Sequence, residues 1–536
     1  MARSHLLSTV ALGLALASPA GSATPARDDT PVRLEVFPLA AVRPVEPLAY
    51  GANEGGHERC TLRRHGGNRF TAFDWETSAS HAGADWKHQH DWYMAPEPEA
   101  RGPGALLGRR LGRDREWGAR SLVTLQLAGY VAADADGPVS EEETAPGPRW
   151  KRVSLEPTEP GPEGWAPDLD DDVVYVDEQV RDLVRRFGTA EEGGVLAYAL
   201  DNEPALWSHT HARLHPRPAT WEEVTSQGIA AARLVTAEDP TALVFGPVLY
   251  GWAAYADLQG APDAARHRGR DRTFTRHYLR LMREASEASG RRLLHRLDIH
   301  WYPEATGEAR VASDAVDDAT ARARVQAPRS LWDATYRERS WIADVAGGPI
   351  RLIPRLREEI DAVYPGTGLA VTEYSFGAAG HVSGGLAQAD ALGIFGRHGV
   401  VACYWSLGGP QEYVESAFAL YLEPGAGLGG FGDVSVHALA GDDELAAVHA
   451  AADSDDPDRL TVVVVSRRLD GPLDVELAVR AGPRAFTEVQ HVGFDSSSPE
   501  LRPLGRPTLD GDVLRHTLPA GAAVLYELRR PAEPPR

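Results

Sequence analysis

The sequence predicts an α/β protein, with a TIM-like (β/α)8 barrel and a second, smaller β-sandwich domain. Short apolar segments alternate with amphipathic helical stretches over most of the 536 residues, and eight such units can close a barrel. Polar residues follow these segments at their carboxyl ends, where barrel active sites are built. Beyond about Gly432 the helical stretches cease, and short strands separated by turns indicate a β-sandwich.

The chain begins with a predicted targeting segment. Arg3 and His5 precede the apolar run 6–17, and small residues follow through Ala23. A basic start, a short apolar run and a small-residue exit are typical of a secretory signal peptide, and the run is too short to cross a bilayer. We therefore expect residues 1–23 to be removed and the mature protein to be secreted, into the periplasm or the medium.

The overall composition constrains the partners. Hydrophobic residues make up 43% of the chain and charged residues 25%, which is ordinary for a globular protein. The net charge of −22 argues against nucleic acid or an anionic membrane as a partner. No later segment is apolar enough for a membrane helix, so we expect no membrane as a partner. We also expect a monomer.

Residues 46–435 are assigned to the barrel. Its predicted helices include 178–187 and 221–236, and two long polar loops, 132–172 and 303–340, interrupt the alternation. Long loops at barrel strand ends often shape a cleft, and disorder is the competing interpretation. The eight predicted strands are 50–53, 62–68, 122–127, 195–203, 243–247, 297–302, 369–373 and 400–405.

Residues 24–45 and 436–536 are assigned to a discontinuous β-sandwich domain. The segment 32–36 reads as a strand although it precedes the barrel, and we expect it to pair with the C-terminal strands. The clearest of those strands are 460–466, 473–479 and 522–528.

Two glutamates stand at the carboxyl ends of predicted strands. Glu203 follows the apolar run 195–200, and Glu373 follows the run 369–372. A glycosidase needs two carboxyl groups, one to protonate the leaving oxygen and one to attack or stabilise the anomeric carbon. For one such glutamate alone, a side chain that simply faces water is the simpler interpretation. The pair favours the glycosidase site.

The chemistry sets further expectations. Carboxyl groups about 5–5.5 Å apart permit a covalent glycosyl-enzyme, and the negative Glu373 should then raise the pKa of Glu203 and keep it protonated. Asn202 could hold the substrate 2-hydroxyl. Because strict alternation would turn Asn202 away from the face of Glu203, both can serve only if the strand end bulges or twists. Asp201 could contact substrate or support its neighbours.

Aromatic residues near the strand ends could stack on the apolar faces of sugar rings. For any one of them, packing in the core or a loop is an equal alternative. We expect Trp75, Tyr302 and Trp405 to lie in the cleft. The full set is Trp75, Trp86, Trp207, Trp301, Tyr302, Tyr374 and Trp405.

Several motifs occur in an order and spacing that fit a known family. They are 64–70 (RHGGNRF), 82–86 (AGADW), 200–207 (LDNEPALW), 300–303 (HWYP), 372–374 (TEY), 404–406 (YWS) and 431–435 (FGDVS). With these motifs the mature chain resembles glycoside hydrolase family 44, the endoglucanase and xyloglucanase family.

The resemblance implies a barrel plus a β-sandwich and a retaining mechanism on β-1,4-glucan backbones. It also implies that Glu203 is the acid/base and Glu373 the nucleophile. The Ala/Arg-rich loop after Pro303 has no clear counterpart in the family. The expected substrate-binding residues are Asn202, Trp75, Arg64, His300, Tyr302, Tyr374 and Trp405.

We expect no cofactor for catalysis. His209, His211 and His215, or His88 and His90 with Asp91, could suggest a metal site, but loop histidines are more often exposed or hydrogen-bonded. A structural calcium could bind a cluster of acidic oxygens, and a solvated acidic turn is the alternative. That cluster is Asp168, Asp170, Asp171 and Asp172.

Cys60 and Cys403 are the only two cysteines. Export permits a disulfide, but Cys403 lies inside an apolar strand, so a buried free thiol is the favoured interpretation.

Together these features predict a retaining endo-β-1,4-glucanase. Its expected substrates are soluble β-glucans, namely xyloglucan and polymers like carboxymethyl cellulose, cleaved by double displacement. Another retaining β-glycanase, such as a mannanase or a xylanase, is the alternative. A non-catalytic glycan-binding protein is a further alternative, which the pair of glutamates disfavours.

Overall fold

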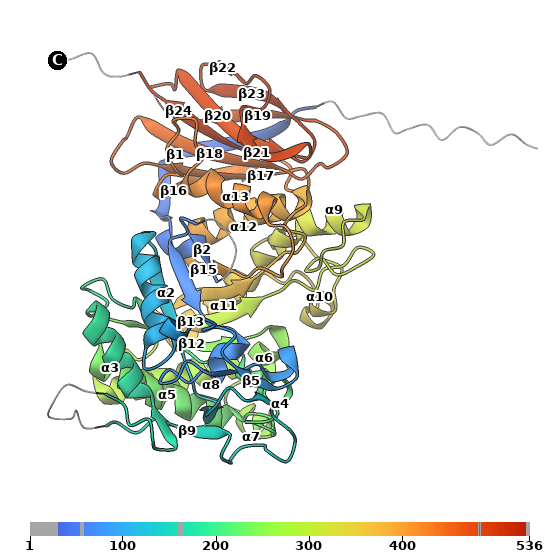
Figure 1. Cartoon of the computed structure of the whole chain (residues 1–536). Helices are drawn as coiled ribbons and strands as arrows, with labels where there is room; N and C mark the ends of the chain where they lie inside the picture. Colours follow the sequence, from blue (N-terminus) through green and yellow to red (C-terminus); the bar gives the residue numbers. More distant parts are fainter. Residues whose placement is uncertain (1–29, 54–57, 159–165, 481, 483, 532–536) are drawn as a thin grey trace, which may run out of the picture.

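The computed structural model describes residues 30–53, 58–158, 166–480, 482 and 484–531. The predicted signal peptide, residues 1–23, lies outside them. A curled sheet lies at one end of the molecule and the barrel at the other, with helices α12 and α13 between them (Figure 1). The predicted fold class is confirmed.

The barrel is a closed sheet of eight parallel strands, in the order β11-β12-β13-β14-β15-β2-β3-β6. All eight predicted strands take part, because each apolar run buries one face inside the barrel and the other under helices. The strands are β2 (Gly51–Ala52), β3 (Leu62–His65), β6 (Arg120–Leu125), β11 (Ala197–Leu200), β12 (Leu243–Leu249), β13 (Arg296–Trp301), β14 (Gly368–Tyr374) and β15 (Val400–Tyr404).

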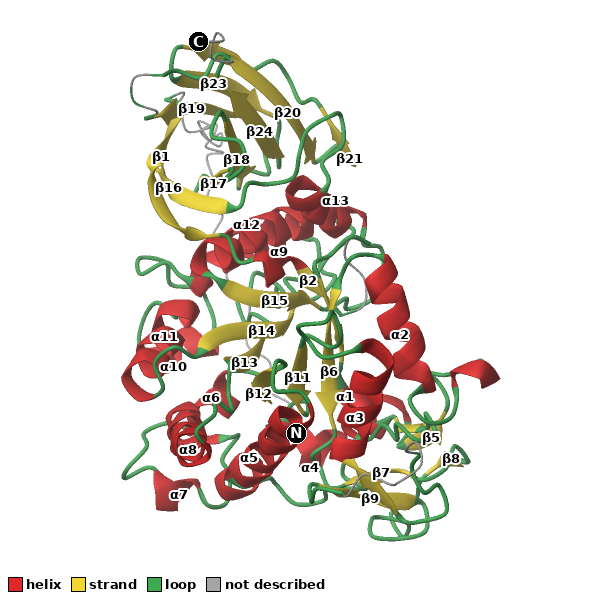
Figure 2. Cartoon of the chain, turned by 90° about the vertical axis from the view of Figure 1, so that its left-hand side faces the viewer, coloured by secondary structure: helices red, strands yellow, loops and turns green. Residues whose placement is uncertain are grey.

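Helices cover the outside of the barrel, as the sequence predicts (Figure 2). In α5, Thr220 accepts a hydrogen bond from the backbone of Glu223, whose side chain bonds back to Thr220, which fixes the start of the helix. The longer helices are α2 (Ala105–Glu116), α3 (Val176–Phe187), α5 (Trp221–Glu238), α8 (Phe274–Ser289), α11 (Leu352–Val363), α12 (Val382–His398) and α13 (Glu412–Leu422).

Short helical segments follow several barrel strands. The α-helical ones are α1 (Asn68–Thr71), α4 (Trp207–Thr210), α6 (Trp252–Asp257), α7 (Ala264–His267), α9 (Asp318–Gln326) and α10 (Trp341–Ala346). The 3₁₀ segments are η1 (Pro47–Tyr50), η2 (Gly83–Trp86), η3 (Pro98–Ala100), η4 (Pro204–Leu206) and η5 (Ala327–Leu331).

The two long polar loops are structured where they are described. Two small sheets, β4-β5-β8 and β7-β9-β10, include strands from the first loop. The second loop contains α9 and η5, and the buried Arg324 of α9 donates to the carbonyl oxygens of Val311 and Phe376 at 3.0 and 2.9 Å. These small strands are β4 (Ser80–His81), β5 (Gln89–Asp91), β7 (Tyr130–Ala132), β8 (Gly137–Pro138), β9 (Trp150–Ser154) and β10 (Val173–Tyr175).

The second sheet has ten strands, in the order β21-β20-β24-β18-β17-β16-β1-β19-β23-β22. Strand β1 (Val32–Pro44), which contains the expected strand 32–36, pairs antiparallel with β16 and parallel with β19. The C-terminal strands are β16 (Val434–Ala440), β17 (Ala446–Ala452), β18 (Arg459–Ser466), β19 (Leu473–Val479), β20 (Glu488–Asp495), β21 (Ser498–Arg502), β22 (Thr508–Asp510), β23 (Val513–Leu518) and β24 (Ala523–Arg529).

The sheet serves two cores because side chains alternate along its strands. In β18, Val462 and Val464 pack inside the curled sheet, whereas Val463 and Val465 pack toward the barrel. Helix α12 fills the seam, and its residues 382–396 are all buried and mostly small or apolar. Its Asp390 pairs with Arg467 of the sheet, and this ion pair joins the two parts of the molecule.

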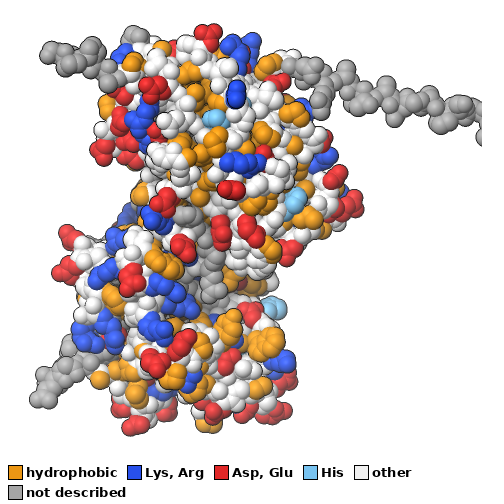
Figure 3. All heavy atoms as spheres, turned by 45° about the horizontal axis from the view of Figure 1, so that its top comes forward, with side chains coloured by type: hydrophobic (Ala, Val, Ile, Leu, Met, Phe, Trp, Pro, Cys, Tyr) orange, Lys and Arg blue, Asp and Glu red, His pale blue; other side chains and the backbone are white. Residues whose placement is uncertain are grey.

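Two surface features bear on the expected partners. Acidic and basic side chains are interspersed over the face drawn in Figure 3 rather than gathered in one patch of a single sign. Among the described residues, none of the helices has the length and apolar character needed to cross a membrane.

Candidate active site

Glu203 lies three residues beyond the end of β11, on a backbone that leaves strand geometry. Asp201 and Glu203 have φ angles of 65° and 47°, in the left-handed region that non-glycine residues adopt only where surrounding contacts hold them. The N–H of Glu203 donates to the carbonyl of Val248 on β12 at 3.0 Å. The expected departure from strand alternation is therefore present, so Asn202 and Glu203 can both face the site.

Asp201 is the buried support of this turn. Its carboxylate accepts hydrogen bonds from the hydroxyl of Thr71 at 2.6 Å and from the backbone N–H of Leu127 and Ala128 at 2.5 and 3.0 Å. Burial raises its pKa to about 6. Of the two roles expected for Asp201, the geometry supports the structural one.

Glu373 is the second carboxyl, on β14. Its Oε1 accepts a hydrogen bond from Arg64 Nη1 at 2.6 Å, and its Oε2 accepts one from the hydroxyl of Tyr302 at 2.8 Å. A charge-assisted bond of this kind from a buried guanidinium is among the stronger contacts a carboxylate can make. Glu373 is thus held from two sides.

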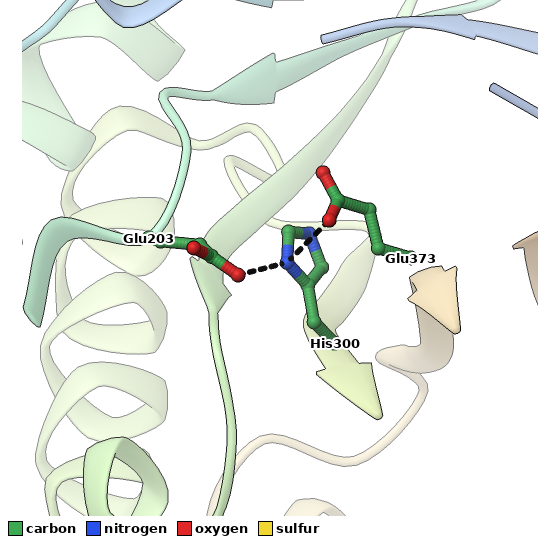
Figure 4. Close-up of side chains that lie close together, drawn as sticks. All are labelled: Glu203, His300 and Glu373. Atoms are coloured by element: carbon green, nitrogen blue, oxygen red, sulfur yellow. Dashed lines mark hydrogen bonds and ion pairs between the residues drawn. The ribbon is translucent and has the colours of Figure 1, made fainter. Parts of the chain in front are cut away.

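His300 lies between the two glutamates (Figure 4). A register shift after Ile299 places His300 opposite Glu373 on the neighbouring strand. Its Nδ1 is 2.7 Å from Glu203 Oε1 and 3.5 Å from Glu373 Oε2. The three donor atoms lie within 4.8 Å of one another, so the two carboxyl groups face each other at short range.

Burial controls the protonation of this group. It raises the pKa of Glu203 to about 7, with Arg64 opposing the rise and Asp85 adding to it. Burial also lowers the pKa of His300 to about 3, so the imidazole is neutral near pH 7. The direction expected for Glu203 is correct, but the cause is different, because removal from water dominates and not the charge of Glu373.

Arg64 joins Glu373 to Asn202. Its Nη2 donates to Asn202 Oδ1 at 2.8 Å, and Asn202 Nδ2 donates to Asn68 Oδ1 at 3.2 Å. Gly66 leaves room for the guanidinium, since a Cβ there would lie 2.5 Å from Arg64 Cζ. The motif 64–70 therefore supplies both the cation and the space in which it lies.

Two residues near the site were not among the expected ones. Asn53 at the end of β2 accepts from Arg64 at 3.1 Å and donates to the carbonyl of Thr372 at 2.8 Å. Asp298 is fully buried inside the barrel, and the hydroxyl of Thr372 donates to its two oxygens at 2.8 and 2.9 Å. Burial raises the pKa of Asp298 to about 7.

The sequence carried a signal for one of these residues. Asp298 lies two positions before His300 on the same strand, so alternation places both on the inner face. A charged residue on the inner face of a barrel strand needs an interior partner.

Of four aromatic residues expected to bind substrate, two lie at the site and two lie in the core. Tyr302 touches Glu373, and the half-buried Trp405 packs near Gly67, where a Cβ would lie 2.7 Å from the indole ring. Trp75 is 1% exposed and belongs to the core, so its expected place in the cleft is wrong. Tyr374 is fully buried, packs on Phe395 of α12 and cannot contact a sugar in this arrangement.

The histidine groups considered as metal sites and the two cysteines can be checked against the structure. Within the described residues, His209, His211 and His215 do not bring three donor atoms within 4.8 Å, and neither do His88, His90 and Asp91. Cys60 and Cys403 are buried free thiols, as favoured.

The acidic turn near Asp168 is held by its own backbone. Asp168 accepts from the N–H of Asp170 at 3.0 Å, and Asp171 accepts from that of Val173 at 2.9 Å. Calcium at this turn stays a prediction.

A (β/α)8 barrel with two carboxyl groups facing each other at its strand ends defines the class of barrel glycoside hydrolases. The model of glycoside hydrolase family 44 matches residues 79–305, which contain Glu203 and His300. The chain is 40% identical over 503 residues to endoglucanase A of Paenibacillus lautus, covering 92% of this chain and 71% of that protein. It belongs to glycoside hydrolase family 44 and is a glycoside hydrolase.

Other relatives agree with this assignment. The chain is 39% identical over 483 residues to the β-mannanase/endoglucanase A of Caldicellulosiruptor saccharolyticus, covering 86% of this chain and 36% of that protein. The structure of a Paenibacillus polymyxa xyloglucanase of family 44, solved with xyloglucan, superposes with a TM-score of 0.89 at 40% identity, covering 93% and 99% of the two chains. A family 44 endoglucanase from Clostridium thermocellum gives 0.89 at 38% identity, covering 93% of this chain and 99% of that one.

Proposed function

We propose that the protein is a retaining endo-β-1,4-glucanase that cleaves soluble β-glucans, with xyloglucan and carboxymethyl cellulose-like polymers as substrates. The observation that carries the proposal is the short separation of Glu203 and Glu373, whose oxygens approach within 4.8 Å. An inverting enzyme needs about 6.5–9.5 Å between its carboxyl groups to admit a water, whereas a retaining enzyme needs about 5–5.5 Å.

In the proposed first step, Glu203 protonates the glycosidic oxygen while Glu373 attacks the anomeric carbon. Glu203 suits the acid role because burial raises its pKa to about 7. Glu373 suits the nucleophile role because Arg64 and Tyr302 fix its carboxylate. In the second step Glu203 removes a proton from water, which attacks the same carbon and releases the sugar with retained configuration.

Of the other expected residues, one orients Glu203 and two are proposed to contact the sugar. The neutral His300 hydrogen-bonds Glu203 at 2.7 Å and sets the direction of its carboxyl group. Asn202, fixed by Arg64 at 2.8 Å, is proposed to hold the 2-hydroxyl of the sugar, where a hydrogen bond strengthens in the transition state. Trp405 is proposed to stack on a sugar ring.

The proposed substrate class draws on the relatives. Three of them are named as endoglucanases, and a xyloglucanase was solved with xyloglucan. The name of the Caldicellulosiruptor relative also includes β-mannanase, and a structural relative 27% identical is described as a bifunctional glucanase-xylanase. A mannanase or xylanase activity is therefore the second candidate. Relative rates on xyloglucan, carboxymethyl cellulose, mannan and xylan separate these candidates.

The mechanism has a direct test. For Glu203→Ala we expect an activated aryl glycoside to form the covalent intermediate without acid help, and azide to release a β-glycosyl azide. For Glu373→Ala we expect azide to attack from the opposite face and give the α-product. The reverse pattern of products would exchange the two roles, and an α-anomer as the first product of the unaltered enzyme would rule out retention.

Export and a monomeric state also belong to the proposal. The secreted protein should start between residues 18 and 24, which N-terminal sequencing checks, and a chain that still starts at Met1 would contradict export. Sedimentation should give a single species of the monomer mass.

A further inference from the structure

Glu203, His300 and Glu373 also form a set of donors that suits a metal ion. A neutral imidazole nitrogen and two carboxylate oxygens are ligands that zinc accepts, usually with water as the fourth. The atoms concerned are Glu203 Oε1, His300 Nδ1 and Glu373 Oε2, all directed into the space between the two glutamates (Figure 4). The donors come from three different barrel strands or strand ends, so the barrel itself holds them in place.

The spacing is close to that of a tetrahedral site. Around a tetrahedral zinc with bonds of about 2.0–2.2 Å, neighbouring donors lie about 3.3–3.5 Å apart. His300 Nδ1 and Glu373 Oε2 are already 3.5 Å apart. Glu203 Oε1 is 2.7 Å from the imidazole and the donor atoms lie within 4.8 Å of one another, so Glu203 has to shift by about 1 Å to reach this spacing.

The charges of the surroundings permit a cation. Arg64 binds Oε1 of Glu373, and Oε2, which accepts from the Tyr302 hydroxyl at 2.8 Å, has a second lone pair for a ligand on the side of His300. Asp298, the third buried carboxyl, interacts with Arg64 from inside the barrel. Three carboxyl groups therefore face one guanidinium, and the site can take a divalent ion without an excess of positive charge.

We propose that Glu203, His300 and Glu373 bind one divalent transition-metal ion of the zinc type, and that the bound ion blocks hydrolysis reversibly. The ion replaces the proton shared between Glu203 and His300, which leaves to solvent. Calcium and magnesium prefer ligand sets made only of oxygen atoms and disfavour an imidazole, so we expect neither to bind here. The inference rests on the proposed function only in that the same glutamates act on the glucan.

A second group of the same residue types provides a matched control. Glu222, Asp263 and His267 also bring three donor atoms within 4.8 Å. There the Glu222 side chain is 59% exposed and pairs with Arg266 at 3.2 Å, so a cation already holds its carboxylate. The variant His267→Asn removes the imidazole of this group and leaves the barrel mouth untouched.

The test is calorimetric titration of the full chain with zinc, together with the absorption spectrum of bound cobalt. We expect one site whose affinity falls by about 100-fold or more in Glu203→Gln and in His300→Asn, since loss of an outer-shell partner alone costs about 10–100-fold. His267→Asn should bind as the unaltered protein does. Thermal unfolding of each variant checks the fold, and the isosteric Glu203→Gln keeps the test decisive if His300→Asn does not fold.

Inhibition supplies the second readout. Zinc should raise the apparent KM for a soluble cello-oligosaccharide without lowering kcat, and a chelator should restore activity. Unchanged zinc affinity in Glu203→Gln, loss of binding in His267→Asn alone, or inhibition that lowers only kcat would each overturn the proposal.

The two proposals fail separately. If Glu203→Gln still cleaves polymer at the normal rate, the proposed function is wrong, whatever the calorimetry shows. If that variant is inactive and the unaltered protein binds no zinc, only the metal site is wrong.

Discussion

Gly66→Ala tests whether the position of one guanidinium controls the active site. The new Cβ would lie 2.5 Å from Arg64 Cζ, 2.7 Å from Nε and 2.8 Å from Nη2. Arg64 cannot simply turn aside, because it is bonded to Glu373, Asn202 and Asn53. The glycine is thus required by the side chain next to it and not by an unusual backbone angle.

The size of the effect follows from these contacts. Ordinary contact with a Cβ begins at 3.4 Å, so the guanidinium has to move by roughly 0.9 Å. A shift of that size directed away from Glu373 would lengthen the 2.6 Å hydrogen bond to roughly 3.5 Å, beyond normal bonding distance. A misplacement of about 1 Å in an active site can cost about 10²-fold in rate, and crowding of a packed interior costs about 1–3 kcal/mol of stability.

The assay compares kcat/KM on a soluble glucan and the midpoint of thermal unfolding. Gly112→Ala is the matched control, because Gly112 lies in α2 and, apart from the adjoining helix backbone, no atom lies within 4 Å of the position that its new methyl group would take. Alanine in a helix interior is worth about 0.5–1 kcal/mol over glycine. We expect Gly66→Ala to lose about 10²-fold in kcat/KM and Gly112→Ala to lose nothing. Activity of Gly66→Ala within a factor of two of the control would refute the reasoning.

Three further outcomes are expected. Because Glu203 must be protonated to act as acid and its pKa is raised to about 7, kcat/KM should fall tenfold per pH unit above about pH 7; a profile flat to pH 9 would contradict this. Burial lowers the pKa of His90 to about 4 and of His211 to about 3, so only the unfolded chain gains these protons as the pH falls below 6.5. Stability should therefore drop by about 1.4 kcal/mol per pH unit for each histidine, and denaturant unfolding of His90→Gln should show a shallower loss. Asp298→Asn should lower kcat more than it changes KM, because it alters the charge beside Arg64 while an amide oxygen still accepts from Thr372; an unchanged kcat would remove Asp298 from the site.

The barrel could be predicted because its strands are encoded locally. Each apolar run is bounded by polar residues, and a residue's place at a strand end follows from the run alone. The two glutamates could be found for the same reason. Their mutual distance could not, because it depends on barrel closure and on the register shift between β13 and β14.

The errors concern side chains whose direction depends on the fold. Tyr374 follows Glu373 directly, so alternation already directs it to the opposite face, toward α12. Trp75 lies outside any strand, and only the packing of the folded chain places it in the core. The loop 303–340 is polar and irregular in sequence, yet Arg324 organises it through the carbonyl groups of Val311 in the same loop and of Phe376 beyond it, contacts that the sequence does not mark.

The position of strand β1 in the sequence affects the order in which the molecule can fold. It is the first described strand of the chain, and it lies between β16 and β19, which follow it by about 400 residues. The residues that form the barrel lie between β1 and these two partner strands in the sequence. During synthesis β1 therefore waits, unpaired, until nearly the whole polypeptide exists.

A chain that ends early leaves β1 with unpaired backbone groups and uncovers the apolar helix α12. Such a fragment would carry all of Glu203, His300 and Glu373 and still expose the surfaces that promote aggregation and proteolysis. We therefore expect prematurely terminated products to aggregate or to be degraded even when their catalytic portion is intact.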